Sequence, residues 1–200
     1  MKGYIKPSII ILAVLVLDQV LKTWIKTNMF IGQEFNILGN WFIIHFTENN
    51  GMAFGMEFGG ELGKLALSIF RIIAVAGIGY GLLHLIQKKY HRGLIYNVAL
   101  IFAGALGNII DSVSYGLIYG YEKLFHGRVV DMLYFPIIQG NFPSWFPIWP
   151  GEEFIFFRPV FNIADAAISL GVILILLYQN RYFKEEIKPV SSINSEIVEE

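Results

Sequence analysis

Apolar residues gather in four runs that are each long enough to cross a bilayer as a helix, which takes about 20 residues. The runs cover roughly 7–27, 62–86, 93–115 and 160–178. Polar residues lie mostly between the runs and after the last one. This pattern predicts a membrane all-α fold with four transmembrane helices in one domain, residues 1–183, and a polar, disordered tail at 184–200.

The connections between the runs differ in charge. Lys and Arg lie near the N-terminus, in the turn at 87–92 and after the fourth run, whereas residues 28–61 contain no Lys or Arg and four Glu. The positive-inside rule therefore places both termini in the cytoplasm. The two long connections, 28–61 and 116–159, are predicted to face outward.

Each outward connection is predicted to carry structure of its own. Residues 34–38 and 41–49 are rich in aromatic and β-branched residues and are separated by Gly39 and Asn40, which predicts a small extracytoplasmic β-hairpin. Residues 135–161 hold too many prolines for a helix. Trp145 and Trp149 suit the lipid headgroup layer, so this segment is predicted to form an interfacial aromatic loop.

The composition supports a membrane protein and argues against several other classes. Hydrophobic residues make up 55% of the chain and charged residues 16%, and the mean hydropathy is +0.55, which is too apolar for an ordinary soluble domain. A net charge of −1 and scattered cations predict no nucleic-acid partner. The chain lacks cysteine, and its four histidines lack ligand spacing, so no metal is predicted.

Four aspartates stand out because an ionised group in an apolar run is costly. Asp18 lies in the first run and Asp111 near the end of the third, whereas Asp131 lies in the second outer connection and Asp165 near the start of the fourth run. Helix rise places Asp111 about 27 Å from the cytoplasmic end of its helix and Asp165 about 7 Å from the outer end of its own. The acids are therefore predicted to meet near the outer surface, with Asp18 somewhat deeper.

Other polar residues accompany these acids. Asn108 and Asn162 each precede an aspartate by three residues and so share its helix face. They either orient the acids and stabilise an oxyanion or form helix–helix hydrogen bonds, and the sequence leaves both open. Lys22 follows Asp18 by four residues, a spacing that allows an ion pair. For Asp111, the alternative to a catalytic role is a helix-end acid bonded to amide donors.

Two carboxylates that lie close together cannot both stay ionised cheaply. The ionised one can take a proton from water while the protonated one donates to a carbonyl oxygen. Such a pair predicts hydrolysis of a peptide bond at a membrane surface. A small proton-coupled transporter is the alternative, and a structural subunit is another. The clustering of the acids near one face and the lack of paired broken helices argue against transport.

Five segments of the chain resemble the family of bacterial lipoprotein signal peptidases, also called signal peptidase II. They occur in the family's order and span nearly the whole chain apart from the tail. The segments are DQVLK at Asp18–Lys22, NNGMAF at Asn49–Phe54, GALGNIID at Gly104–Asp111, GRVVDM at Gly127–Met132 and FNIADAAIS at Phe161–Ser169. Each is weak alone, but five in order are specific.

The resemblance implies a membrane aspartyl endopeptidase with a small extracytoplasmic β-cradle. It would remove signal peptides from diacylglyceryl-modified prolipoproteins on the amino side of the lipidated cysteine, with Asp131 and Asp165 as the catalytic pair. The supporting residues that match are Asp18, Lys22, Asn49, Gly51, Asn108, Asp111 and Asn162. The resemblance implies no metal or cofactor, a monomer in contact with membrane lipid, and a location in the bacterial inner membrane with the active site near its outer face.

The chain departs from the family pattern in two places. Many members have Arg directly after the third-span acid, where this chain has Ser112. Arg128 and Arg158 are the candidates to replace it. The outer segments 113–126 and 134–159 also look longer than usual, so substrate contacts in them cannot be carried over. The small residues of GALG are expected to allow close helix approach.

Overall fold

The computed structural model of the chain describes residues 2–50, 60–145, 147–156 and 159–183. Its long helices are α1 (Lys2–Asn28), α2 (Gly60–Gln87), α3 (Arg92–Ile110) and α5 (Ile163–Tyr182). A π-helical turn, η2 (Asp111–Tyr115), and the short α4 (Gly116–Ile118) continue α3. Within these described residues, four helical segments are long and apolar enough to cross a membrane, with Arg92–Ile118 counted as one. The predicted four-helix membrane fold is confirmed.

The fourth helix begins later than the apolar run suggested. We predicted a start near residue 160, but Val160–Phe161 form a short strand, β6, and the helix begins at Ile163. The reason is local, because the backbone of Asn162 is extended, with φ −120° and ψ −179°, and its side chain caps the helix.

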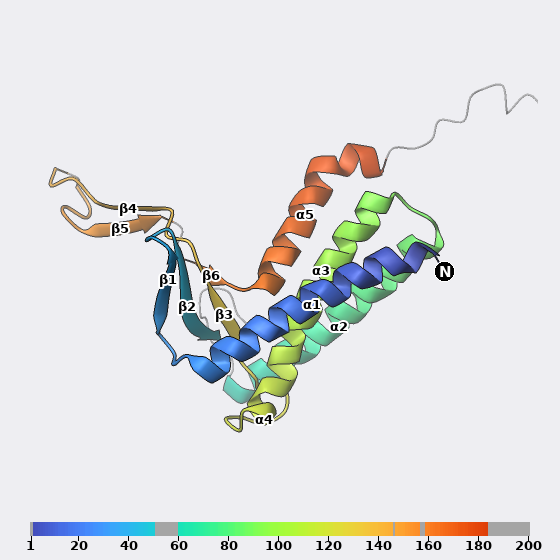
Figure 1. The fold of residues 1–200 in the computed structure, drawn as a ribbon, viewed down its shortest axis with the longest axis horizontal. Coiled ribbons are helices and arrows are strands. Elements are labelled where there is room, and N and C mark those ends of the chain that lie inside the picture. Colours follow the sequence, from blue (N-terminus) through green and yellow to red (C-terminus); the bar gives the residue numbers. More distant parts are fainter. Residues whose placement is uncertain (1, 51–59, 146, 157–158, 184–200) are drawn as a thin grey trace, which may run out of the picture.

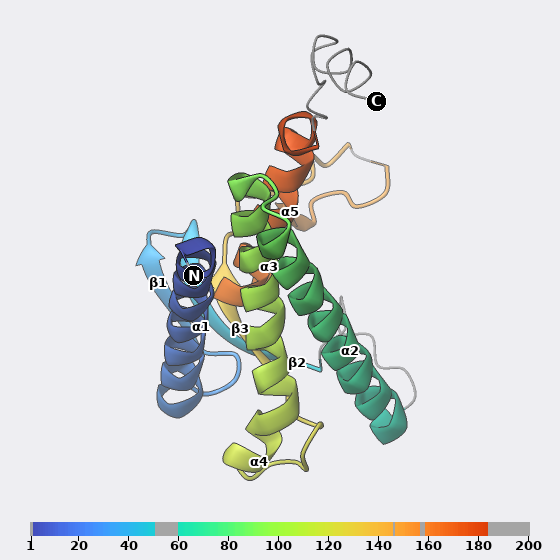
Figure 2. The ribbon, with the colours of Figure 1, turned by 90° about the vertical axis from the view of Figure 1, so that its right-hand side faces the viewer.

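The central helix of the bundle is α3, which packs against α1, α2 and most extensively α5. Figure 2 shows it running between α1 and α2. Glycines permit this close packing, because a Cβ at Gly104 would lie 2.2 Å from the backbone oxygen of Ala164. A Cβ at Gly171 would likewise lie 2.7 Å from the backbone oxygen of Asn97. The expectation that GALG allows close helix approach is therefore confirmed.

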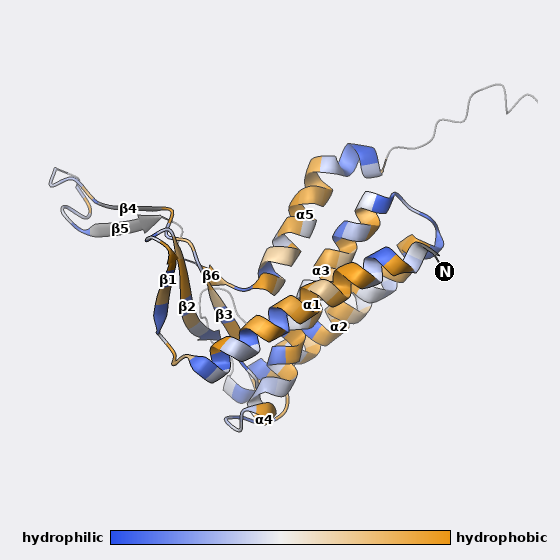
Figure 3. Cartoon of the chain, viewed as in Figure 1, coloured by the Kyte–Doolittle hydropathy of each residue, from blue (hydrophilic) through white to orange (hydrophobic). Residues whose placement is uncertain are grey.

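The long helices consist largely of hydrophobic residues (Figure 3), and many of their large apolar side chains are exposed within the protein. Leu12 on α1, Phe70 on α2 and Leu177 on α5 are each more than 60% exposed within the protein. Such a continuous apolar surface is unfavourable in water. It matches lipid acyl chains, which are as apolar as leucine.

A four-stranded antiparallel sheet lies at one end of the bundle (Figure 1). Its order is β1 (Glu34–Leu38), β2 (Phe42–Asn49), β3 (Val129–Tyr134) and β6. The predicted hairpin is therefore present as β1–β2, and it is part of a larger sheet. The segment that carries Asp131 is a strand whose register pairs Asp131 with Thr47 of β2.

A second hairpin occupies the predicted aromatic loop. Its strands are β4 (Ile138–Asn141) and β5 (Glu153–Phe156), and it projects sideways from the main sheet, away from the helices (Figure 1). Trp145 is 78% exposed and Ile148 64% exposed. Proline excludes a helix here, as predicted, but it leaves room for two short strands.

One apolar core attaches the main sheet to the helices. It joins Ile25 of α1 and Met29, directly after α1, to Phe46 of β2 and to Val130 and Met132 of β3. Side chains alternate along a strand, so Asp131 points away from the face that buries its two neighbours. This packing fixes the position of Asp131 relative to the helix ends.

Candidate active site

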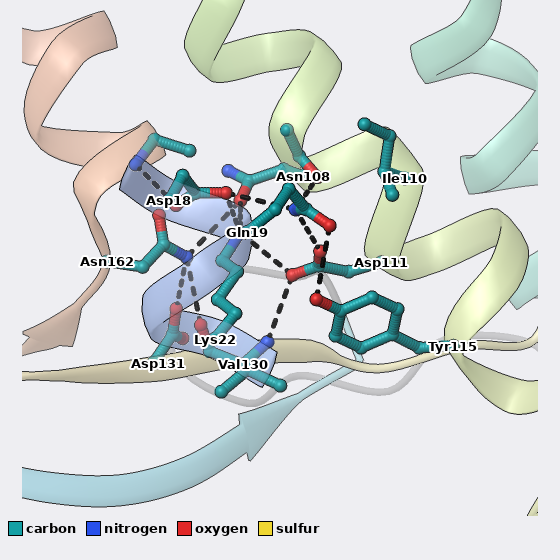
Figure 4. A network of polar contacts seen from close by, with 12 residues as sticks. Asp18, Gln19, Lys22, Asn108, Ile110, Asp111, Tyr115, Val130, Asp131 and Asn162 are labelled. Atoms are coloured by element: carbon teal, nitrogen blue, oxygen red, sulfur yellow. Dashed lines mark hydrogen bonds and ion pairs between the residues drawn. The ribbon is translucent and has the colours of Figure 1, made fainter. Parts of the chain in front are cut away.

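Polar side chains from α1, α3, η2, β3 and α5 meet where the bundle joins the main sheet (Figure 4). The described residues predicted for the site all take part in this network. They are Asp18, Lys22, Asn49, Asn108, Asp111, Asp131, Asn162 and Asp165. Gly51 and the rest of its motif up to Phe54 lie outside the described residues.

Lys22 joins two of the aspartates. Its Nζ lies 2.8 Å from Asp18 Oδ2, 2.8 Å from Asp111 Oδ2 and 3.0 Å from Asn108 Oδ1. Lys22 and Asp111 are 0% exposed and Asp18 is 1% exposed. The predicted Asp18–Lys22 ion pair is therefore present, and Asp111 shares the same cation. An ammonium has three donors, so Lys22 has none left for another group.

Asp18 and Asp111 also receive hydrogen bonds that hold the site together. The backbone N–H of Ala164 donates to Asp18 Oδ1 at 2.9 Å and fixes the start of α5 against α1. Gln19 Nε2 donates to Asp111 Oδ1 at 2.9 Å, and the hydroxyl of Tyr115 donates to Gln19 Oε1 at 3.1 Å. Gln19 and Tyr115 were not predicted. Gln19 could have been considered because it directly follows Asp18.

The first turn of α5 explains the spacing of Asn162 and Asp165. Asn162 is the N-cap residue, and its Oδ1 accepts from the backbone N–H of Asp165 at 2.9 Å. Asp165 Oδ2 accepts in return from the backbone N–H of Asn162 at 3.3 Å. This capping box satisfies two N–H groups at the helix start. The positive end of the helix dipole favours a negative charge on Asp165.

The two asparagines each hold one of the remaining acids. Asn162 Nδ2 donates to Asp131 Oδ1 at 2.7 Å, and Asn108 Nδ2 donates to Asp165 Oδ1 at 2.7 Å. The asparagines also contact each other, with Asn162 Nδ2 3.2 Å from Asn108 Oδ1. Both alternatives left open by the sequence fit this geometry, because these bonds hold the acids and also join α3 to the start of α5.

Asp131 differs from the other acids in its surroundings. Among the described residues, no ion pair joins Asp131 or Asp165 to Lys or Arg. Asp131 is 4% exposed. Burial, and secondarily the charge of Asp165, raises the pKa of Asp131 to about 7, against the opposing effects of Asn162, Lys22 and Asn49. Asp131 therefore exchanges its proton near neutral pH.

The structure shows one of the two arginines that were candidates to replace the missing Arg, together with an arginine that was not predicted. Arg128 Nη1 lies 3.3 Å from Glu48 Oε2 of β2, so Arg128 interacts with the sheet, and nothing here supports it as the replacement for the missing Arg. Arg158 lies outside the described residues. The arginine that contacts Ser112 is Arg71 of α2, whose Nη1 lies 3.2 Å from Ser112 Oγ. Sequence reasoning missed Arg71, although a cation in an apolar run is itself a signal.

Within the described residues, no group of three or more His, Asp or Glu side chains is arranged to hold a metal. What the site can do follows from its charges. One lysine is shared by two acids, and two other acids, held by amides, lie without an ion pair to Lys or Arg among the described residues.

Comparisons with known proteins agree on one family. A family model described as signal peptidase (SPase) II matches residues 10–181. The lipoprotein signal peptidase of Porphyromonas gingivalis is 50% identical over 192 residues, covering 88% of this chain and 83% of that protein. That of Amoebophilus asiaticus is 42% identical over 177 residues, covering 84% and 75%.

Two solved structures of a bacterial membrane enzyme are also similar to this chain. One has a TM-score of 0.62 at 29% identity and covers 92% of this chain and 94% of its own. The other has a TM-score of 0.60 at 30% identity and covers 90% and 94%. The likeness spans the helices and the sheet together.

Proposed function

We propose that this chain, which belongs to the signal peptidase II family of aspartic peptidases, uses Asp131 and Asp165 as its catalytic pair. The chain is a bacterial membrane protein that processes lipoprotein precursors, as the family resemblance predicted. The alternative of a small proton-coupled transporter finds no support in the comparisons.

We choose Asp131 and Asp165 as the pair because all three N–H donors of Lys22 are used by other groups. These donors contact Asp18, Asp111 and Asn108, so the two most deeply buried acids of the network share the ammonium group. A buried carboxylate fixed by a cation and amides has a structural role. Asp131 and Asp165 remain, and the charge of Asp165 acts on Asp131. Two such neighbouring carboxylates divide into an acid and a base.

The environments of the two acids suggest which of them holds the proton. Asp165 accepts bonds from Asn108 Nδ2 and from the Asn162 backbone at a helix N-terminus, which stabilises its anion. The pKa of Asp131 is raised to about 7, mainly by burial, which stabilises its neutral form. In the resting enzyme, Asp131 therefore carries the proton and Asp165 carries the charge.

Hydrolysis then follows from these two states. Asp165 takes a proton from a water molecule, and the water oxygen bonds to the scissile carbonyl carbon. Asp131 gives its proton to the carbonyl oxygen, and a neutral tetrahedral diol forms. The diol returns a proton to Asp131, Asp165 passes its proton to the leaving nitrogen, and the C–N bond breaks. Both acids end in their starting states.

The substrate is a precursor that bears a diacylglyceryl group, and the cut lies on the amino side of the lipidated cysteine. The exposed apolar faces of the helices would allow acyl chains to reach the site from within the bilayer. The cation distribution supports cytoplasmic termini and a site near the outer face. The β4–β5 hairpin, with exposed Trp145 and Ile148, would lie in the headgroup layer and help to hold the peptide.

A gel-shift assay with two purified precursors tests this function. One precursor carries the diacylglyceryl group on its cysteine, and the matched precursor has Ser at that position and cannot be lipidated. We expect the chain in liposomes to shorten the first and leave the second intact. Equal cleavage of both would contradict recognition of the lipid, and cleavage of neither would contradict the peptidase assignment.

A further inference from the structure

Arg71 presents a guanidinium to the active site from the middle of a membrane-spanning helix. It lies on the inward face of α2, since Ser68 and Val75, one turn before and one turn after it, are buried. Ser68 Oγ donates to the backbone oxygen of Phe125 at 2.9 Å, which holds this part of α2 in place. An arginine at this depth is costly and calls for a function.

The contact of Arg71 leads directly to the catalytic pair. Its Nη1 donates to Ser112 Oγ at 3.2 Å, and Ser112 Oγ donates to the backbone oxygen of Asn108 at 2.9 Å. Asn108 Nδ2 then donates to Asp165 Oδ1 at 2.7 Å. The guanidinium of Arg71 therefore braces the residue that orients Asp165.

Electrostatic interaction also connects Arg71 to the catalytic pair, independently of these hydrogen bonds. Arg71 interacts electrostatically with Asp165 most strongly, then with Asp131 and Asp111. Lys22 already forms ion pairs with Asp18 and Asp111. Arg71 is therefore a second cation near a cluster of four acids. The charged groups that act on Arg71 are Asp165 of α5, Asp131 of β3 and Asp111 of η2, and Asp111 in turn pairs with Lys22 of α1.

Ser112 is the small residue that makes this arrangement possible. It is 5% exposed and lies in the π-helical turn η2, directly after Asp111. Turns of this kind are frequent at functional sites. A serine leaves the space next to its hydroxyl to a guanidinium from α2, whereas an arginine at 112 would bring its own guanidinium and repel Arg71.

We propose that Arg71 is a positioning residue for the Asp131–Asp165 pair and that, with Ser112, it supplies from α2 the positive charge that an arginine at position 112 would supply from α3. It holds Asn108 through Ser112 and places a positive charge near the two acids. This inference rests on the proposed catalytic pair.

Three variants test the proposal through kcat, KM and the pH dependence of kcat in the gel-shift assay. Arg71→Gln removes the positive charge, and Arg71→Lys keeps the charge but lacks the planar guanidinium group. Arg71→Ser combined with Ser112→Arg moves the guanidinium to the neighbouring helix. Arg92→Gln, at the exposed start of α3, is the control for loss of an arginine.

We expect Arg71→Gln to lower kcat by about 10²-fold, because a small misplacement of catalytic groups has an effect of this size, with little change in KM. Without the cation, ionisation of Asp131 becomes less favourable, so the limb of the pH profile that reports Asp131 moves to higher pH. Arg71→Lys should keep the wild-type limbs with a lower kcat. The exchange variant should recover kcat at least tenfold over Arg71→Gln.

Wild-type kcat and pH limbs in Arg71→Gln would overturn the proposal. If Arg71→Gln does not fold, the other two variants decide: a folded exchange variant without activity, or Arg71→Lys with displaced limbs, would overturn it equally. These results are separable from failure of the catalytic pair, because normal processing by a folded Asp131→Asn variant would contradict the pair itself.

Discussion

Asn162 and Asp131 are joined by a 2.7 Å hydrogen bond from Nδ2 to Oδ1, although 31 residues separate them along the chain (Figure 4). The same asparagine caps α5 and exchanges two backbone bonds with Asp165. One side chain therefore fixes the acid on the strand relative to the acid on the helix. The side-chain oxygen of Asn162 caps α5, and its side-chain nitrogen orients Asp131.

These two tasks can be separated by substitution. Serine is as good an N-cap as asparagine, but it is too short to place an N–H on Asp131. We expect Asn162→Ser to retain most of the stability and to lose activity by about 10²-fold. Asn162→Ala should lose the same activity and, in addition, about 1 kcal/mol of stability. Melting in detergent and the gel-shift assay measure both. Full activity of the folded Asn162→Ser variant would exclude a role for the amide nitrogen.

Lys22 is predicted to be among the most important residues for stability. Lys22→Met leaves Asp18 and Asp111 buried without their cation. Breaking a buried ion pair by removing one partner costs about 3–5 kcal/mol. The matched control is Lys88→Met at the exposed turn after α2, which should stay within about 0.5 kcal/mol of wild type. Unfolding measured for both variants in the same detergent checks the difference. Equal stabilities would mean that the Lys22 network does not stabilise the packing of α1 against α3 and η2.

The raised pKa of Asp131 makes a prediction for stability against pH. The folded pKa is about 7 and the ordinary value is 3.8, so the folded state binds more protons than the unfolded state between these values. The stability contribution is therefore fully present below the ordinary pKa and is lost as pH rises through about 7. The asparagine of the Asp131→Asn variant cannot ionise, so this variant should not lose stability as the pH rises.

The gain in stability from Asp131→Asn should accordingly be small near pH 4 and grow to on the order of several kcal/mol at pH 8. Melting temperatures of the variant and the wild type across this pH range provide the measurement. A difference that does not change with pH would show that Asp131 titrates normally in the folded protein.

The sequence predicted those features that depend on short-range chemistry. Lipid requires long apolar helices, so the spans could be located to within a few residues. The Asp18–Lys22 pair followed from helix spacing alone, and the close approach at Gly104 followed from residue size. The start of α5 was misplaced by three residues because Val160 and Phe161 are apolar whether they lie in a helix or in a strand.

Features that depend on contacts between distant segments were harder to predict. Spacing alone could not show that Lys22 also reaches Asp111, and the choice of Asp131 as the partner of Asp165 relied on family resemblance. The structure adds that Asp111 is paired with Lys22, whereas Asp131 is held by an amide of Asn162. The contact between Arg71 and Ser112 joins two helices, and nothing in either helix alone indicates it.

The central claim is that Asp131 and Asp165 act together as the acid and the base. The most direct measurement is a gel-shift assay of a purified, diacylglyceryl-modified precursor with Asp131→Asn and Asp165→Asn, each shown to be folded by its melting curve. Glu122→Gln, at an exposed position, is the control for the change from acid to amide. We predict that both aspartate variants leave the precursor at full length while the control processes it normally. Normal processing by either folded aspartate variant would contradict the claim.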